Sequence, residues 1–530
     1  MLLGLSACGG NPTHSAGPPA VPADAKRLPA RLRRLTNHEY EATVSALLGR
    51  PIALDGRLPP DVRHDGYTTN ADQPVTASWA SRLDALARSL AHEATSRDLA
   101  RLVPARGERT ANDYVAAALR LGERAFRRPL TATERQLIER IVRDDATPRS
   151  GFESVLVALL QAPSLLYLSE MGALAKGDAG QPRDPRPGSR IRLDPYETAS
   201  LLAYTVQGGP PDDELLAAAA AGQLDRGEER SHQARRLLAR SETRHRFRRF
   251  VLEWLEVDGL DATAKSAELY PDYEKLRPLM LEETSQFVDQ VMVHHGASLR
   301  SLLDGGFASV EPRMARFYGL STYGPEASLT STRRRGLLQQ ASFLSAHAHP
   351  DVTSPVKRGD FVLRKLLCER VPRPGEIGLD LVMPAPSTTL TTRQRFAVHS
   401  QQGQCNSCHR EIDAVGFSFE AFDAMGRTRS TEHSLPVETR GEAELGAASY
   451  RFQDSAELTS QLAARDEATE CFARHGFRWF GATSTEAIED GYLAVWRKLP
   501  VERRSSLLES VVAWVESDLF VEREVVGGTE

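Results

Sequence analysis

Hydrophobic residues recur three and four positions apart along most of this 530-residue chain, which is the spacing of an amphipathic helix. Residues 35–49, 276–292 and 505–520 show it clearly. The alternation typical of a strand is sparse, and residues 448–454 are the best short candidate. The pattern therefore predicts a mainly α, multi-domain helical protein with little β structure.

Several of these segments begin with a recognisable helix start. Thr36 is followed three residues later by Glu39, and Thr131 is followed by Glu134 in the same way. Such pairs form a capping box, in which each residue bonds the other's backbone N–H group. Asp194 with Pro195 and Glu197, and Thr391 with Gln394, predict two further helix starts.

Polar stretches rich in glycine and proline divide the chain at residues 176–190, 321–335 and 370–389. We therefore expect five helical domains, over residues 31–105, 110–175, 190–320, 332–432 and 450–525, with a haem module in the fourth. Hydrophobic residues make up 41% of the chain, charged residues 26%, and the net charge is −5. This balance gives no reason to expect a nucleic acid as partner.

The sequence Cys405-Asn406-Ser407-Cys408-His409 is the strongest chemical motif. A zinc site needs four ligands, and the remaining cysteines are isolated from one another. A redox dithiol of the thioredoxin type would follow a strand in a βαβ pattern, which the flanking sequence does not show. We therefore expect one covalent haem c, with thioether links from Cys405 and Cys408 and His409 as proximal iron ligand. A structural or redox pair and another metal site are the alternatives.

The first residues resemble a lipoprotein signal, because Leu5-Ser6-Ala7 precedes Cys8 as at a lipoprotein processing site. Residues 1–8 are then a signal remnant and the Pro/Ala-rich residues 9–30 a tether. No Lys or Arg precedes Cys8, so we expect the true start to lie upstream. An apolar tail with an incidental cysteine is the alternative. The expected location is the cell envelope, as an outer-membrane lipoprotein facing the periplasm or the surface.

Two cysteines remain, Cys368 and Cys471. In an exported protein we expect them to form a disulfide, with two free thiols as the alternative.

The order of the motifs resembles the planctomycete-type multi-domain secreted cytochromes, whose modules are domains of unknown function. The residues that carry the resemblance are Arg33-Arg34-Leu35-Thr36-x-x-Glu39-Tyr40, Phe126-Arg127-Arg128-Pro129-Leu130-Thr131, Pro211-Asp212-Asp213-Glu214-Leu215 with Glu282-Glu283-Thr284, Thr353 to Gly359, Leu367-Cys368, His399, the haem stretch through Arg427, and the tail around Cys471. Ala414 departs from the family, which usually has proline there. The resemblance implies the domain architecture and a haem, and little about a reaction.

The sixth iron ligand separates an electron carrier from a catalyst, because an open position admits small ligands. His399 is one candidate, and the family also has a histidine there; a helix-end histidine bonded to backbone is the alternative. Met425 offers a thioether, with core packing as the alternative. His347 and His349 could reach the distal face or lie in a solvated loop. Arg358 and Arg427 could bind the haem propionates or form surface ion pairs.

Three functions remain open on the sequence. The first is a lipid-anchored monohaem protein that transfers electrons to or from a redox partner in the periplasm or at the cell surface. The second is a haem-dependent oxidoreductase, peroxidase-like or oxidising an extracellular substrate. The third is a cell-surface scaffold or polymer-binding protein. Asp212, Asp213, Glu282 and Glu283 are more typical of helix starts than of catalysis, so whether the protein is an enzyme stays open.

Overall fold

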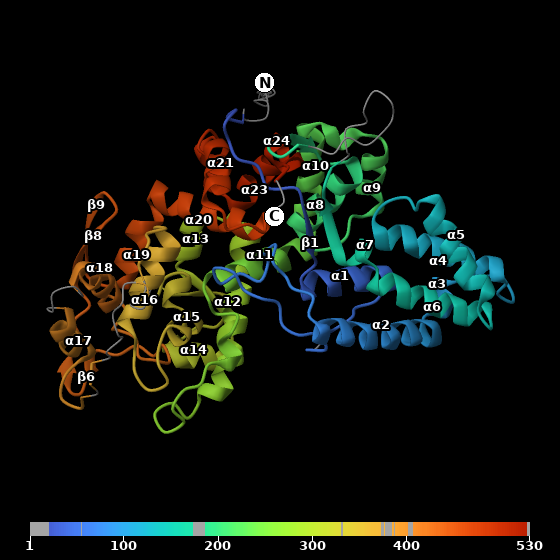
Figure 1. Cartoon of the computed structure of the whole chain (residues 1–530). Helices are drawn as coiled ribbons and strands as arrows, with labels where there is room; N and C mark the ends of the chain where they lie inside the picture. Colours follow the sequence, from blue (N-terminus) through green and yellow to red (C-terminus); the bar gives the residue numbers. More distant parts are fainter. Residues whose placement is uncertain are drawn as a thin grey trace, which may run out of the picture.

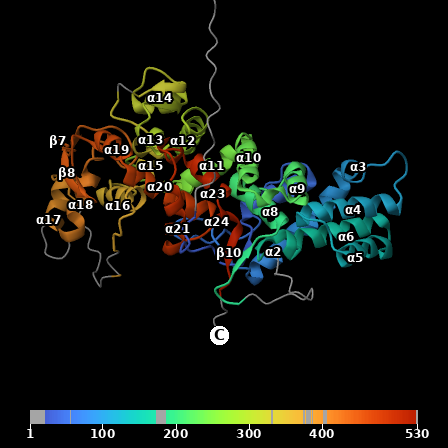
Figure 2. The ribbon, with the colours of Figure 1, turned by 90° about the horizontal axis from the view of Figure 1, so that it is seen from above.

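The computed structural model describes residues 21–54, 56–172, 186–329, 332–372, 376, 384–385, 387–400 and 406–526. Helices dominate, and the strands are short and paired two by two (Figure 1). The mainly α fold class is therefore confirmed. In two views related by 90°, α2 to α6 form one end of the molecule and α17, α18 and β8 the other (Figure 2).

The N-terminal helices share one hydrophobic core, built from residues between Leu35 and Leu168 with Tyr204 added from α8. Capping boxes start α1 at Thr36 and α5 at Thr131, as the sequence predicts. The helices are α1 (Asn37–Leu48), α2 (Ala77–Arg97), α3 (Leu99–Leu102), α4 (Ala111–Phe126), α5 (Ala132–Asp144), α6 (Pro148–Gln161) and α7 (Pro163–Leu166).

The next four helices pack against the C-terminal helices, which are more than two hundred residues away in the sequence. Arg230 shows this directly, because its guanidinium donates to the main-chain carbonyls of Val515, Glu516 and Ser517. The elements are α8 (Pro195–Gln207), α9 (Asp213–Ala220), η1 (Gln223–Asp225), α10 (Gly227–Leu238) and α11 (Ser241–Trp254), with α20 (Asp466–Phe480), α21 (Glu486–Trp496), α22 (Val501–Arg504), α23 (Leu507–Glu516) and α24 (Asp518–Val521).

The remaining helices connect this body to the segment that carries the cysteine–histidine motif. Of these, α16 and α18 make close backbone contact (Figure 1). They are η2 (Leu260–Ala262), α12 (Tyr273–His294), α13 (Leu299–Asp304), α14 (Pro312–Tyr318), η3 (Leu337–Gln339), α15 (Ala341–Ala346), α16 (Pro355–Phe361), the π-helical η4 (Val362–Leu366), α17 (Thr392–Ser400), α18 (Asn406–Phe417) and α19 (Ser455–Ala463).

All strand pairs in the described residues are antiparallel. The strand expected near residues 448–454 is confirmed as β9, whereas the break expected at 321–335 is wrong in part, because it contains β5 paired with β4. The pairs are β1 (Arg31–Arg34) with β2 (Tyr167–Glu170), β3 (Arg190–Arg192) with β10 (Glu522–Glu524), β4 (Phe307–Val310) with β5 (Gly324–Ser328), β6 (Thr431–Glu432) with β7 (Leu435–Pro436), and β8 (Gly441–Leu445) with β9 (Ala448–Phe452).

One continuous core runs through four of the expected domains. Its members include Tyr67 of the first domain, Leu202 of α8, Phe361 of α16, Val415 of α18 and Trp514 of α23. Segments that read as separate modules along the sequence therefore share buried surface, and the fourth segment is anchored to the C-terminal helices. This arrangement packs α18, which carries Cys408 and His409, against α16 and the continuous core.

Candidate functional site

The cysteine–histidine motif lies at the start of α18. This helix begins at Asn406, so Cys408 and His409 belong to its first turn. Cys405 lies outside the described residues, and of Cys408 only the backbone is described. The motif therefore places the histidine on the first turn of a helix, directly after the second cysteine.

A buried carboxylate orients His409. Its Nδ1 lies 3.1 Å from Oδ1 of Asp413, one turn further along α18. The His409 side chain is 19% exposed and that of Asp413 only 4%. A carboxylate on one ring nitrogen fixes the tautomer and the ring plane, and directs the other nitrogen, Nε2, toward a metal. Nothing in the sequence motif itself includes Asp413, but the i, i+4 spacing on a helix could have pointed to it.

An adjoining face of α18 is apolar and packed. Ile412 and Val415 belong to the continuous core, and Gly359 of α16 crosses close to Ile412. Of the three residues to which a c-type haem is attached, the structure describes the side chain of His409 alone. Its orientation by a buried carboxylate is compatible with a role as iron ligand.

His399 lies near the end of α17, and α17 packs against α18. Its side chain lies outside the described residues, so its role as sixth ligand stays a prediction. Met425 is 2% exposed, in a buried cluster that includes Met280 and Met314. This placement agrees with core packing, and no described contact joins Met425 to His409.

Arg358 is fully buried, and its guanidinium is occupied by main-chain carbonyls. It donates to the carbonyls of Leu344, Phe419, Phe422 and Asp423. Leu344 belongs to α15 and the other three residues to the turn after α18, and their carbonyls converge on this guanidinium of α16. The guanidinium thus holds this turn in place, and the described contacts give no support to the propionate role expected for it.

Arg427 forms the alternative that the sequence left open, a surface ion pair. Its Nε lies 2.7 Å from Oδ2 of Asp423, and its guanidinium stands 5.1 Å from the ring centroid of Tyr270. His347, by contrast, is buried and bonds the carbonyl of Leu255 through Nε2, so it is not a solvated loop residue. The four paired carboxylates also have structural partners where they are buried: Asp212 caps α9, and Glu283 contacts Tyr318.

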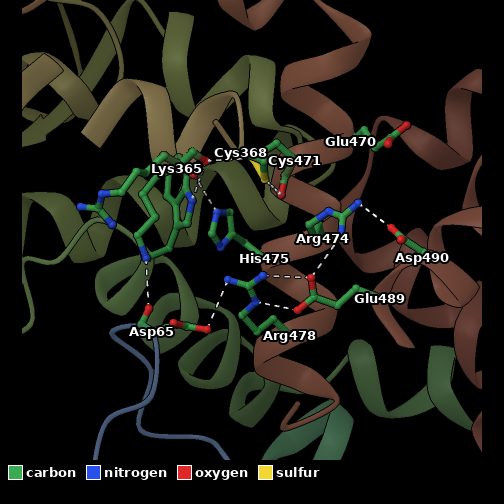
Figure 3. The surroundings of a disulfide bond; sticks show 12 residues. Asp65, Lys365, Cys368, Glu470, Cys471, Arg474, His475, Arg478, Glu489 and Asp490 are labelled. Carbon is green, nitrogen blue, oxygen red and sulfur yellow. Dashed lines mark hydrogen bonds and ion pairs between the residues drawn. A yellow bond between two sulfur atoms is a disulfide. The ribbon is translucent and has the colours of Figure 1, made fainter. Parts of the chain in front are cut away.

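Cys368 and Cys471 form the expected disulfide, with their sulfurs 2.09 Å apart (Figure 3). His475 lies beside it, with a ring nitrogen within 4.8 Å of both sulfurs. The Tyr67 hydroxyl contacts Nδ1 of His475 at 2.9 Å, and burial holds the pKa of this histidine well below its usual range. The sulfurs are bonded to each other, so this group is a structural link between η4 and α20.

Glu283, which the sequence suggests as a helix-start carboxylate, lies instead in the middle of α12, in a buried cluster with Tyr318 and Arg334 that the sequence did not predict. The Tyr318 hydroxyl donates to Oε2 of Glu283 at 2.6 Å, and Arg334 stacks 3.9 Å from the Tyr318 ring centroid. Burial raises the pKa of Glu283 to about 8, against the opposing effects of Tyr318 and Arg334. The sequence signal was present in the Glu282-Glu283-Thr284 motif, but its partners come from distant segments.

Cys8, the expected lipid-bearing residue, lies outside the described residues. In the part of the chain that the structure describes, no helix has the length and apolar character needed to cross a membrane.

Comparison with protein families finds four planctomycete-type domains in a string, each described as a protein of unknown function. They are PSD3 (DUF1587) at residues 33–96, PSD5 (DUF1595) at 115–170, PSD4 (DUF1592) at 193–320 and PSCyt3 (DUF1588) at 334–432. No curated protein and no solved structure matches the chain. The string is consistent with the family that the sequence resembles. The segment matched by PSCyt3, whose name suggests a cytochrome-like domain, contains residues 405–409.

Proposed function

We propose that this protein is an exported, lipid-anchored monohaem c-type cytochrome that transfers electrons to or from a partner protein in the periplasm or at the cell surface. The observation that carries the proposal is the contact between His409, on the first turn of α18 directly behind Cys405 and Cys408, and the buried Asp413 one turn further along the helix. The cytochrome-like name of the matched PSCyt3 domain supports it.

The residues of the chain have separate tasks in this proposal. Cys405 and Cys408 hold the haem through thioether bonds, and His409 binds the iron through Nε2. Asp413 keeps the imidazole in one tautomer and orientation, and raises its basicity. The bound haem supplies reversible one-electron chemistry, and the helix crossing of α16 and α18 keeps its ligand fixed during electron transfer.

The anchor belongs to the same proposal. Acylation at Cys8 places the protein on a membrane of the cell envelope, with residues 9–30 as the tether to the folded body. Two or more acyl chains hold a protein stably at a membrane, whereas one chain does so only marginally. Replacing Cys8 by serine in the exported precursor should release the protein from the membrane fraction. A Cys8→Ser protein that still carries acyl chains contradicts this part.

The haem assignment is tested by expression in a host with a c-type maturation system. We expect the wild-type protein to keep its haem through denaturation and acid extraction, and to show the reduced spectrum of a haem with two thioether links. Cys405→Ala with Cys408→Ala should abolish the covalent haem. Ser407→Ala is the matched control, because it changes the motif while leaving its three attachment residues intact. Wild-type protein that matures without covalent haem in such a host contradicts the proposal.

A further inference from the structure

A cleft of about 770 Å³ opens between the N-terminal body, formed by helices α1 to α7, and the helices α8 and α9. These helices lie on the side of the molecule away from α18 (Figure 1). Both arginine side chains and apolar side chains line the cleft. Its lining includes Arg101, Arg120, Arg124, Arg128, Tyr196 and Asp213.

Arg120 and Arg124 lie four residues apart on α4, so both project from one face of this helix into the cleft. Both are exposed. Within the described residues Arg120 makes a single hydrogen bond, at 3.5 Å, to the carbonyl of Leu102. Arg124 pairs with Asp213 across the cleft, at 3.3 Å. Among the arginines named in the lining of the cleft, Arg120 and Arg124 therefore have the weakest contacts.

The pair between Arg124 and Asp213 is itself open to water. The exposed fractions of the two side chains are 57% and 81%. Such a pair contributes little to stability. The neighbouring acid Asp212 is held much more firmly, because Arg236 and Arg240 both bond it. Asp213 thus faces Arg124 alone, and a carboxylate arriving from solution can take its place.

The same ion pair stands where the cleft continues into a second hollow of about 470 Å³, which shares Arg124, Asp213 and Leu216 with it. The two hollows together form an open groove beside α1. Apolar residues also line the groove, with Pro129, Tyr196 and Leu216 among them. A ligand for this groove is elongated and carries both anionic groups and C–H surface.

We propose that the groove binds a linear carboxylated oligosaccharide, with uronate carboxylates on Arg120 and Arg124 and pyranose rings against Tyr196 and Pro129. The planar guanidinium fork suits a carboxylate better than an ammonium group does. Side chains four residues apart on a helix start about 5–6 Å from each other, close to the rise of one pyranose unit. The proposal does not depend on the haem, and adds a polymer-binding function to the cytochrome.

The decisive experiment compares Arg124→Ala with Asp213→Ala in the full chain. Both substitutions break the same exposed ion pair, but only the first removes a ligand contact, whereas the second removes a competitor. With hexagalacturonate as the probe in calorimetric titration, we expect Arg124→Ala and Arg120→Ala each to weaken binding about tenfold. Asp213→Ala should strengthen it by about threefold or more.

Arg143→Ala is the matched control, since Arg143 is an exposed arginine of α5 that bonds Asn112 outside the groove. Its affinity should equal that of the wild type, and Arg124→Lys should fall between wild type and Arg124→Ala. Circular dichroism and the melting temperature verify that each variant is folded. Equal binding of a neutral cello-hexaose, tighter binding of a poly-glutamate peptide, or parallel effects of Arg124→Ala and Asp213→Ala would each overturn the proposal.

Discussion

The backbone of Gly359 in α16 lies against the backbone of Ile412 in α18, so close that a Cβ added to Gly359 would stand 2.0 Å from the Ile412 carbonyl oxygen. A second glycine, Gly416, makes the reciprocal approach to the Pro355 carbonyl, again at 2.0 Å from an added Cβ. The helix that carries His409 therefore packs against α16 at two points where a glycine allows the backbones to touch.

Gly359→Ala should force these helices apart. We expect the free energy of unfolding to fall by about 3 kcal/mol, at the upper end of overpacking costs, because the obstacle is backbone and cannot rotate away. Denaturant titration measures the change. Gly107→Ala is the control, since an added Cβ there meets nothing within 4 Å. Equal stability of both variants would show that the two helices adjust at no cost.

Asp413→Asn tests the carboxylate behind His409 in the haem-loaded protein. The amide is a weaker partner for Nδ1–H, so in the proposed haem protein the bond between His409 and the iron should weaken by about 10–100-fold. The pH at which acid displaces His409 from the iron should rise by about one unit, as followed by the visible spectrum. Glu411→Gln on the same helix is the control and should leave this transition unchanged.

Removing the disulfide tests the link between η4 and α20. It joins residues 103 positions apart, so it restricts a long loop in the unfolded chain. Cys368→Ala with Cys471→Ala should lower the free energy of unfolding by about 2–5 kcal/mol. Wild-type protein kept with a thiol reductant should show the same loss. An unchanged unfolding midpoint in the double variant would mean that the packed helices alone supply this stability.

Local features of the fold could be predicted from the sequence, and distant partners could not. Thr36 and Thr131 start helices as expected because both members of each capping box are three residues apart. Strand β5 was missed because its partner, β4, lies beyond an intervening helix. The contacts of Arg358 could not be predicted for a related reason, because its partners are the carboxylate of Glu420 and carbonyls up to 65 residues away.

The candidate site also combines local features that the sequence predicts with distant contacts that it does not. The motif at residues 405–409 predicts haem attachment by itself, and the helical spacing places Asp413 on the same face as His409. Asp413 can orient His409 because its carboxylate is buried. This burial depends on packing between helices, which no local sequence pattern predicts. The Arg124–Asp213 contact across the cleft likewise joins residues 89 positions apart.

Glu283 should make stability depend on pH in a distinctive direction. Its pKa is raised from 4.5 to about 8 in the folded protein by burial, so between these values the folded state binds the proton more tightly than the unfolded state. Its contribution is complete below about pH 4.5 and is lost as the pH rises through about 8. Glu283→Gln should remove on the order of 5 kcal/mol of this dependence. Denaturant titrations at several pH values measure it, with the exposed neighbour in Glu282→Gln as the control.

Glu39 should make stability depend on pH in the opposite direction, with stability lost at acid pH. It is fully buried and forms a two-pronged ion pair with Arg33, at 2.8 and 3.1 Å. Burial alone would raise the pKa of Glu39, but Arg33 and Arg246 outweigh that effect and lower it to about 2. Because the folded pKa lies below the unfolded value, the stabilisation is present above about pH 4.5 and is lost as the pH falls toward 2.

Glu39→Gln should cost about 3–5 kcal/mol at neutral pH, since it leaves two buried guanidinium groups without their carboxylate. The same variant should lose less stability than the wild type between pH 5 and pH 3, because the group that titrates there is gone. Glu41→Gln, two residues along α1, is the control for a partly exposed acid of the same helix. If Glu39→Gln and the wild type lose stability in parallel on acidification, the buried pair is not what makes the N-terminal body acid-sensitive.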